Sequence, residues 1–372
     1  MNESPSRDGQ NRPTYSIGVD LGGTKMLAGA VDRAGAVTHI ERELTKPEEG
    51  AQAVIERLAG LVGRVRGQLE PDAHIEAIAI GVPGGVDSAN GIVDKAPNLG
   101  WENVALASLL QPLVGAPVIL DNDVRVAVMG EHGYGVGRGA KAMVGIWVGT
   151  GIGGGIVIDG RLWQGTRGVA GEIGHSIIDP NGPRCPCGNR GCIEALASRT
   201  SIERDVRKEI KKGTKSRILK RMKEKGRIQL ASSVVAWALR KEDQAFLKVF
   251  RRAQKNLGLF TANLVNALDP EVIVFGGGIA ERLGEQFVRP IREEARKHVL
   301  SKRDIDRIRI VPTSLGEAAP VAGAALLARL RLGLVTEDEI RNTPRPVAVE
   351  TDAEETHTDA GDSAPLAAMA VS

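Results

Sequence analysis

The stretch "YSIGVDLGGTKMLAGAVD" (residues 15–32) consists of two apolar runs joined by a turn of small residues, Gly22-Gly23-Thr24. The stretch "AMVGIWVGTGIGGGIVIDG" (residues 142–160) repeats this pattern around a second glycine turn at residues 149–155. The runs have no polar face, so we expect strands that are buried on both faces of a sheet. Two similar halves, each opening with a glycine hairpin, predict a duplicated α/β fold with a cleft between the halves. In such sheets, ligands collect at the carboxyl ends of the strands.

The composition is that of an ordinary globular protein and excludes several functional classes. The 372 residues, 42% of them hydrophobic and 26% charged, suffice for two domains with sizeable cores. Aromatic residues make up only 3% while glycines number 46, which favours the tight turns of an α/β protein over a β-sandwich. The net charge of +3 is too small to indicate a nucleic-acid or membrane partner. No apolar run approaches the roughly 20 residues of a membrane span, and the polar N-terminus lacks a signal-peptide core. We therefore expect a cytoplasmic protein.

Both ends of the chain are polar and lack apolar periodicity. We expect residues 1–14 to be a disordered lead and residues 335–372, rich in Asp, Glu, Thr and Pro, to be a disordered tail. The folded body is therefore predicted at about 15–334. Within it, the basic segment 204–227 has no interleaved aromatic residues, which favours a solvated helical face over a nucleic-acid site.

The motif "DLGGTK", which begins at Asp20, has the small residues of a phosphate-binding turn. Glycines let backbone N–H groups approach phosphate oxygens, Thr24 and Lys25 add donors, and Asp20 could hold Mg²⁺ through water. The spacing of a Walker A loop is absent, and a plain hairpin turn explains this motif alone about equally well. The second glycine turn at residues 149–155 favours a site in which both turns bind one polyphosphate from opposite sides. A third cluster, "FGGG" at residues 275–278, could admit a nucleobase or ribose, or could be a tight connection between a strand and a helix.

The segment "VILDNDV" delivers Asp121, Asn122 and Asp123 to the end of an apolar strand, directly before a helical pattern. A carboxylate at the carboxyl end of a strand is well placed as a general base, which in phosphoryl transfer accepts the proton of the attacking hydroxyl. Asp and Asn are also favoured N-caps. We therefore expect one of these residues to cap the helix while another acts as the general base, and Asp123 is the candidate base.

All three cysteines lie within eight residues and follow a histidine, in the pattern H-x9-C-x-C-x4-C formed by His175, Cys185, Cys187 and Cys192. One imidazole and three thiolates suit tetrahedral Zn²⁺, and four protein ligands leave no position for a catalytic water. A disulfide would leave an odd cysteine and needs an oxidising compartment. We therefore predict a structural zinc site.

Three polar residues are candidates for binding a polyhydroxylated ligand. Glu172 and Glu194 flank the metal motif and could accept hydrogen bonds, although each could equally be an ordinary surface residue. The amide of Asn98, in "PNLGW", can both donate and accept.

Eight motifs, spread over about residues 15–330, carry a resemblance to a known family. They are "DLGGTK" (20–25), "GVPGGVD" (81–87), "NLGW" (98–101), "ND" (122–123), "GTGIGGG" (149–155), "GEIGH" (171–175), "CPCGNRGCIE" (185–194) and "FGGGIA" (275–280). The glycine turns are common, whereas the "ExGH" and "CxCGxxGCxE" elements are highly specific. Together they resemble the ROK family (repressors, open reading frames and sugar kinases) of the actin-like, hexokinase-like superfamily.

The resemblance implies two actin-like (ribonuclease H-like) α/β domains around a central cleft, with a zinc knuckle at residues 175–192. The N-terminal domain would comprise residues 15–123 together with a returning helix at about 318–334. The C-terminal domain would comprise residues 124–317. A homodimer is expected from the resemblance alone.

The resemblance also implies roles for individual residues. Asp123 would deprotonate the 6-hydroxyl of a sugar, and His175 would coordinate zinc while turning its other ring nitrogen towards that sugar. The remaining residues of the sugar pocket would be Gly84, Asn98, Asn122, Glu172 and Glu194. The ATP phosphates would contact Asp20, Gly22, Gly23, Thr24, Lys25, Gly149, Thr150 and Gly151, and adenosine would face Gly276, Gly277 and Gly278. One departure is Arg125, where many members have Asn, and it could contact a phosphate or point into a subunit contact.

The activity implied is the ATP- and Mg²⁺-dependent phosphorylation of a hexose, with glucose as the first expectation. Kinases for N-acetylmannosamine, N-acetylglucosamine and fructose share the "ExGH" element and are alternatives. The repressors that resemble these kinases carry an additional N-terminal helix-turn-helix domain, whereas only some fifteen residues precede the first expected strand here. A catalytically silent sugar sensor is disfavoured because the base, the sugar-binding residues and both phosphate turns are present.

Overall fold

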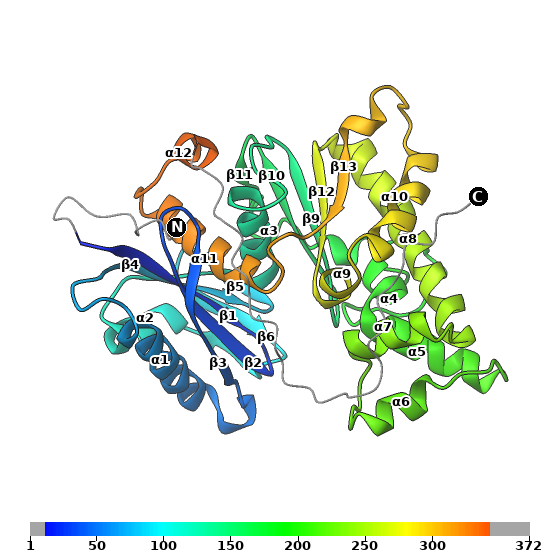
Figure 1. The fold of residues 1–372 in the computed structure, drawn as a ribbon, viewed down its shortest axis with the longest axis horizontal. Coiled ribbons are helices and arrows are strands. Elements are labelled where there is room, and N and C mark those ends of the chain that lie inside the picture. The colour runs from blue at the N-terminus through cyan, green and yellow to red at the C-terminus, as the bar shows by residue number, and fades with distance from the viewer. Residues whose placement is uncertain (1–11, 343–372) are drawn as a thin grey trace.

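Two five-stranded sheets on either side of a pair of central helices make up the computed structural model, which describes residues 12–342 (Figure 1). The first sheet has the order β3-β2-β1-β4-β8 and contains β1 (Thr14–Leu21), β2 (Lys25–Val31), β3 (Val37–Leu44), β4 (His74–Val82) and β8 (Val118–Asn122). The second has the order β11-β10-β9-β12-β13 and contains β9 (Met143–Val148), β10 (Ile152–Ile158), β11 (Arg161–Leu162), β12 (Val272–Gly276) and β13 (Arg309–Pro312). A smaller antiparallel sheet contains β5 (Gly85–Asp87), β6 (Ile92–Ala96) and β7 (Trp101–Val104).

The two large sheets repeat one topology. Strand β1 pairs antiparallel with β2 and parallel with β4, and β9 pairs in the same way with β10 and β12. The central strand β1 is almost entirely buried, as expected for a strand covered on both faces. The predicted duplicated α/β fold is thereby confirmed.

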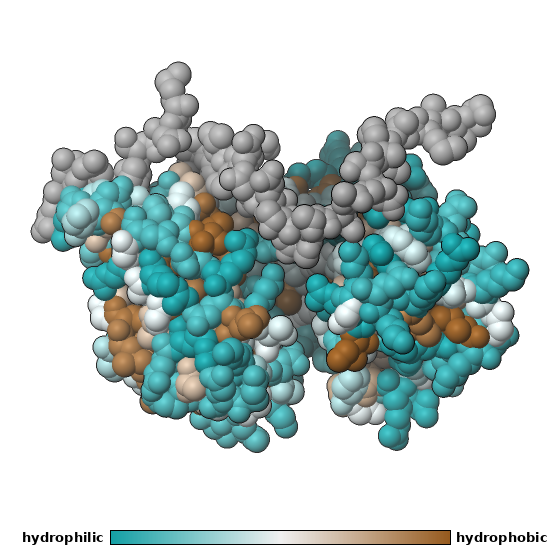
Figure 2. Space-filling model, turned by 60° about the horizontal axis from the view of Figure 1, so that its bottom comes forward, coloured by the Kyte–Doolittle hydropathy of each residue, from teal (hydrophilic) through white to brown (hydrophobic). Residues whose placement is uncertain are grey.

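Helices cover the outer faces of the sheets and fill the space between them. Helices α1 (Ala51–Gly67) and α2 (Leu106–Val114) pack on the first sheet, and α3 (Asp123–Gly133) and α11 (Ala318–Arg331) lie between the sheets (Figure 1). The other helices are α4 (Ile193–Ala197), α5 (Arg199–Lys211), α6 (Ile218–Glu224), α7 (Ser232–Arg240), α8 (Gln244–Leu268), α9 (Gly278–Leu283), α10 (Glu285–His298) and α12 (Glu337–Asn342), with 3-10 turns η1 (Pro47–Glu49), η2 (Ile173–His175) and η3 (Ile305–Arg307). Figure 2 shows a groove between two lobes whose visible surface is mainly hydrophilic. In the described part of the chain, every helix is too short or too polar for a bilayer span.

The central helices α3 and α11 cross at glycines. A Cβ atom on Gly323 would lie 1.7 Å from the carbonyl oxygen of Val126, and one on Gly130 would lie 2.2 Å from that of Ala319. Any larger side chain at these positions would therefore push the two backbones apart. The absence of side chains lets the helices touch where the chain passes between the two sheets.

A buried glutamate on α3 holds the connection that leads from β13 back to α11. Glu131 is completely buried and accepts hydrogen bonds from the hydroxyl of Thr313 (2.5 Å), from the backbone N–H (2.9 Å) and hydroxyl (3.1 Å) of Ser314, and from the backbone N–H of Leu315 (2.8 Å). The N–H of Val136 donates to it as well, at 2.9 Å. A buried carboxylate is tolerated because these donors satisfy it.

Helix α11 is fixed to the first sheet by a second buried charge. Arg329 is fully buried, and its Nε lies 2.8 Å from the Oε2 of Glu76 on β4. Its other nitrogens donate to the carbonyl oxygens of Asp32 and Val31, both at 2.6 Å. Every arm of the guanidinium thus has an acceptor on the first sheet or on the turn that follows β2.

The structure corrects the expected ends of the folded body. Residues 1–11 and 343–372 lie outside the described residues, and with them most of the predicted disordered lead and tail. Thr14, however, is fully buried in β1, because the sheet pairing with β4 extends back to it. Residues 337–342 form α12, whose Ile340 is only 8% exposed and packs into the core between the sheets. The prediction of disorder was therefore wrong for these two short stretches.

Candidate functional site

The junction between β8 and α3 places Asp123 at the start of a helix. Asn122 is the N-cap, because its side-chain oxygen accepts hydrogen bonds from the N–H groups of Val124 (3.0 Å) and Arg125 (3.1 Å). Its amide nitrogen donates to the carbonyl oxygen of Gly84 at 3.1 Å. The capping role thus falls to Asn122, whereas the carboxylate of Asp123 accepts a hydrogen bond from the adjacent N–H of Val124 at 2.9 Å.

Three carboxylates gather at this junction. Burial raises the pKa of Asp123 to about 7, and the negative charges of Asp20 and Glu172 contribute to the rise. Burial likewise raises the pKa of Asp20, at the end of β1, to about 6. A carboxyl group that titrates near neutral pH is matched to proton transfer at that pH. The arrangement can therefore take a proton from a hydroxyl group.

Asp121 and Arg125 form a buried ion pair behind the candidate base. The Nε of Arg125 lies 2.5 Å from the Oδ1 of Asp121, and its Nη1 donates to the carbonyl oxygen of Gly168 at 2.5 Å. Arg331 of α11 pairs with the other oxygen of Asp121. Arg125 is only 5% exposed. Both roles expected for it, a phosphate contact and a subunit contact, were wrong, since its charge is neutralised inside the protein.

The first glycine turn lies against Asn98. The N–H of Gly22 donates to the carbonyl oxygen of Lys25 at 3.0 Å, which closes the turn between β1 and β2. A Cβ atom on Gly23 would lie 2.8 Å from both the Cβ and the carbonyl oxygen of Asn98. Two residues expected in different parts of the site, one for phosphate and one for sugar, are therefore in contact. Thr24 and Lys25 are exposed beside them.

The second glycine turn is built around Glu194. The structure limits this turn to Gly149, Thr150 and Gly151, because β10 begins at Ile152, and a hydrogen bond of 2.9 Å joins the two glycines. The N–H of Ile152 donates to the Oε2 of Glu194 at 3.0 Å. A Cβ atom on Gly151 would lie 2.4 Å from the same oxygen, so a glycine is required for the carboxylate to approach the turn.

The third glycine cluster connects β12 to α9. Gly276 is buried, and a Cβ atom on it would lie 2.2 Å from the ring of Trp147 on the neighbouring strand. Gly277 has a φ of +82° and lies against the carbonyl oxygen of Val148, and Gly278 begins α9. Gly277 and Gly278 are partly exposed beside the end of β9, whereas the Cα of Gly276 faces an indole ring.

The predicted metal ligands converge. One ligand atom from each of His175, Cys185, Cys187 and Cys192 lies within 4.8 Å of all the others. The sulfurs of Cys187 and Cys192 are 3.7 Å apart, and the Nδ1 of His175 is 3.6 Å from the sulfur of Cys185. A tetrahedral Zn²⁺ with bonds of about 2.3 Å to sulfur and about 2.1 Å to nitrogen would separate these pairs by about 3.8 Å and about 3.6 Å. The four side chains fit such an ion.

The two glutamates that flank the knuckle lie close to its ligands. The Nδ1 of His175 faces the cysteines, which leaves its Nε2 at 4.0 Å from the Oε2 of Glu172. The Oε1 of Glu194 lies 3.8 Å from the sulfur of Cys185. Glu172 is exposed and Glu194 partly buried. A chain of contacts thus leads from Glu172 through the knuckle and Glu194 to the second glycine turn.

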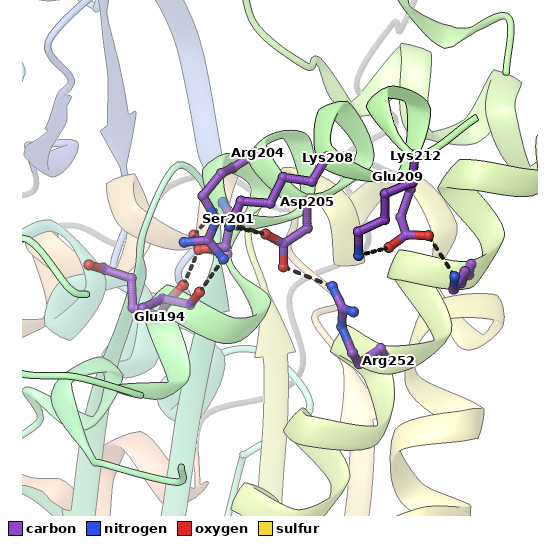
Figure 3. A network of polar contacts seen from close by, with 11 residues as sticks. Glu194, Ser201, Arg204, Asp205, Lys208, Glu209, Lys212 and Arg252 are labelled. Carbon is purple, nitrogen blue, oxygen red and sulfur yellow. Dashed lines mark hydrogen bonds and ion pairs between the residues drawn. The ribbon is translucent and has the colours of Figure 1, made fainter. Parts of the chain in front are cut away.

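The basic segment that follows the knuckle takes part in an internal polar network (Figure 3). Arg204 donates to the carbonyl oxygen of Ala195 at 2.8 Å, and Asp205 pairs with Arg252 of α8 at 2.8 Å. The buried Glu209 forms ion pairs with Lys212, directly after α5, and with Lys248 of α8. The predicted solvated helical face is therefore only part of the description, because this end of α5 also anchors α4 to α8.

The sequence reasoning missed several charged residues near the glycine turns. The Nζ of Lys25 lies 3.6 Å from the Oε2 of Glu317, which precedes α11. Burial, reinforced by the charge of Glu317 and more weakly by that of Asp20, raises the pKa of Glu281 to about 7. Arg199 contacts Thr150. Glu317, Glu281 and Arg199 come from distant segments and belong to none of the eight motifs, so only the folded chain reveals them beside Lys25 and Thr150.

Comparison with known proteins identifies the family. The sequence profile of the ROK family matches residues 16–331. The chain belongs to the ROK family. A ROK glucokinase from Streptomyces griseus, solved in complex with glucose and AMPPNP, matches with a TM-score of 0.74 and 31% identity over 85% of this chain and 99% of that one. This similarity confirms the actin-like α/β fold that the motifs implied.

Relatives within the ROK family include kinases and repressors. A glucokinase from Thermotoga maritima is 37% identical over 321 residues, which are 85% of this chain and 98% of the relative. A xylose repressor from Caldicellulosiruptor bescii is 31% identical over 278 residues, which are 74% of this chain and 69% of the relative. Membership of the ROK family alone therefore does not decide between a kinase and a regulator, and the site must do so.

Proposed function

We propose that this ROK protein is a glucokinase, which transfers the terminal phosphoryl group of ATP to the 6-hydroxyl of glucose. The observation that carries the proposal is the position of Asp123. Its carboxylate lies at the end of a strand, next to Asp20 and Glu172, and burial raises its pKa to about 7. A regulator that only senses a sugar has no need of a carboxyl group tuned for proton transfer.

The reaction follows from these groups. Asp123 accepts the proton of the sugar 6-hydroxyl as the hydroxyl oxygen bonds to the terminal phosphorus of ATP. The bond from that phosphorus to the bridging oxygen breaks, and ADP leaves. Donors on the two exposed glycine turns, Thr24, Lys25 and Thr150 among them, bind the phosphate oxygens. The glycine cluster at Gly277 and Gly278 faces the nucleoside.

The sugar subsite of the proposal lies between the base and the knuckle. Asn98, Asn122, Glu172 and Glu194, with the Nε2 of His175, supply hydrogen-bonding groups to the hydroxyls, and Gly84 lines the same pocket. Support comes from the contact of Asn98 with the first turn and from the electrostatic coupling of Glu172 to the base. Further support comes from the contacts of Glu194, whose carboxylate lies against both the N–H of Ile152 in the second turn and the sulfur of Cys185.

Two cations belong to the proposal. Zn²⁺ would be held by the Nδ1 of His175 and the three thiolates, where it would brace the sugar-binding wall and take no part in proton transfer. Burial raises the pKa of the Cys185 thiol to about 12 when no cation is present, so the thiolate form needs a positive charge beside it. Mg²⁺ would enter with ATP and neutralise phosphate charge, with Asp20 as the residue that would hold it through water.

Domain closure, assembly and location complete the proposal. Residues 15–123 with the returning segment 318–334 would form one domain and residues 124–317 the other. The two would close on the substrates and exclude water. A homodimer in the cytoplasm, where thiols remain reduced, is proposed for the whole enzyme. Sedimentation of the purified protein would decide the assembly.

The deciding experiment offers purified protein Mg²⁺, ATP and a panel of sugars. We expect ADP release with glucose at a kcat/KM above that for N-acetylmannosamine, N-acetylglucosamine and fructose. A different preferred sugar would correct the substrate and leave the kinase assignment intact. No ADP release with any hexose would refute the kinase and favour the sugar-sensing regulator. Polyphosphate in place of ATP would test a second phosphoryl donor.

A further inference from the structure

Arg199, the first residue of α5, lies directly on the second glycine turn. Its backbone N–H donates to the carbonyl oxygen of Gly149 at 2.9 Å, and its Nη2 donates to the hydroxyl of Thr150 at 2.8 Å. The hydroxyl of the next residue, Thr200, donates to the carbonyl oxygen of Thr150 at 2.8 Å. Three hydrogen bonds thus tie the start of α5 to this turn.

Within residues 12–342, no carboxylate forms an ion pair with Arg199. Burial lowers the pKa of the guanidinium, and Glu203, one turn further along α5, only partly offsets this. Arg204, Arg207 and Lys208 on the same helix each form an ion pair, whereas the described residues offer none to Arg199. Arg199 also occupies the positive end of the helix dipole, where a cation is unfavourable. A half-buried guanidinium whose side-chain partner is a neutral hydroxyl favours the binding of an anion.

Hydrogen bonds fix the first turn of α5, which carries the guanidinium of Arg199. Ser198 caps α5 by accepting a hydrogen bond from the N–H of Ser201 at 3.2 Å. The hydroxyl of Ser201 donates to the carbonyl oxygen of Glu194 at 2.6 Å, and Arg204 donates to that of Ala195 (Figure 3). These hydrogen bonds join the first turns of α5 to α4, the helix that carries Glu194.

We propose that Arg199 binds the terminal phosphates of the nucleotide held at the turn of Gly149, Thr150 and Gly151. The inference rests on the proposed function and adds a residue that none of the sequence motifs includes. One arm of the guanidinium, Nη2, orients Thr150, and the remaining N–H groups of the fork are left for phosphate oxygens. Arg199 thereby favours ligands with more than one phosphate over nucleoside monophosphates.

The test measures a series of ligands rather than a single affinity. Calorimetry with Mg²⁺ and AMP, ADP or AMPPNP compares the full chain with its Arg199→Gln variant. We expect the variant to bind AMP as the wild type does, and to bind ADP and AMPPNP about tenfold to a hundredfold more weakly, the range of a charge-assisted hydrogen bond. In turnover, KM for ATP should rise while KM for the sugar stays unchanged.

A matched control is Lys208→Gln, which removes one positive charge from the exposed side of the same helix. It should leave the whole series unchanged. Arg199→Lys keeps the charge and should recover part of the ADP affinity, and it replaces the glutamine variant if that variant melts early. Equal weakening for AMP, ADP and AMPPNP, or none, would overturn the inference. If the wild type phosphorylates no hexose, the proposed function fails, but the ligand series still decides the role of Arg199.

Discussion

Lowering the pH from 8 to 6 is expected to slow the kinase through protonation of Asp123. The base works in its ionised form, and burial together with the charges of Asp20 and Glu172 raises its pKa to about 7. The ionised fraction then falls from about 0.9 at pH 8 to about 0.09 at pH 6, so kcat/KM should fall roughly tenfold. An aspartate at the ordinary value of 3.8 would remain ionised and give a flat profile over this range.

The assay follows ADP by chromatography of quenched samples, since coupling enzymes have pH dependences of their own. Asp20→Asn should move the acidic limb to lower pH, because the charge of Asp20 is the largest electrostatic contribution to the raised pKa after burial. The readout is the position of the limb, which a general loss of rate does not change. Asp306→Asn, a change at an exposed carboxylate paired with Arg296, is the control and should leave the profile unaltered. A flat profile, or one limb common to wild type and Asp20→Asn, would refute the reasoning.

Three further predictions concern the base, the metal and the connection to α11. Asp123→Asn should abolish turnover and retain sugar binding by calorimetry. Retained turnover would exclude Asp123 as the base. The same variant should have a higher melting temperature at pH 8, because the raised pKa of Asp123 means that its ionised carboxylate destabilises the fold above pH 3.8. Cys187→Ser should lose the metal in elemental analysis and weaken sugar binding, and normal kinetics without metal would show that the knuckle does not support the sugar wall. Glu131→Gln should lower the free energy of unfolding in urea by about 1–3 kcal/mol, because an amide leaves some of the buried donors around residues 313–315 unpaired; an unchanged midpoint would contradict the role given to this carboxylate.

Local patterns explain which parts of the structure could be predicted from the sequence. The two glycine hairpins and the histidine–cysteine spacing are set by neighbours along the chain, so the repeated sheets and the convergence of the metal ligands could be predicted. At the end of β8 the residue types alone could not decide the roles, because Asn and Asp are equally good caps. Only the bonds of Asn122 to Val124 and Arg125 free Asp123 for the base.

Contacts between distant segments explain most of what could not be predicted. The partner of Lys25 is Glu317, and the donors to Glu131 come from residues 313–315, so no spacing rule connects them. Arg125 was misjudged because its ion pair with Asp121 becomes visible only when both side chains are seen to point inward. The tail was predicted to be disordered from residue 335 onward, because Ile340 by itself produces no apolar periodicity.

The buried ion pair between Arg329 of α11 and Glu76 of the first sheet has a consequence for how this chain folds during translation. Glu76 emerges early, but its fully buried partner Arg329 is made 253 residues later. Until then only Arg33, at 2.7 Å, balances the carboxylate, and the inner face of the first sheet lacks its helix. The half of the protein that is translated first should therefore be the last to reach its native state. An N-terminal fragment ending at Asn122 should expose that face to chaperones, whereas full-length protein should not.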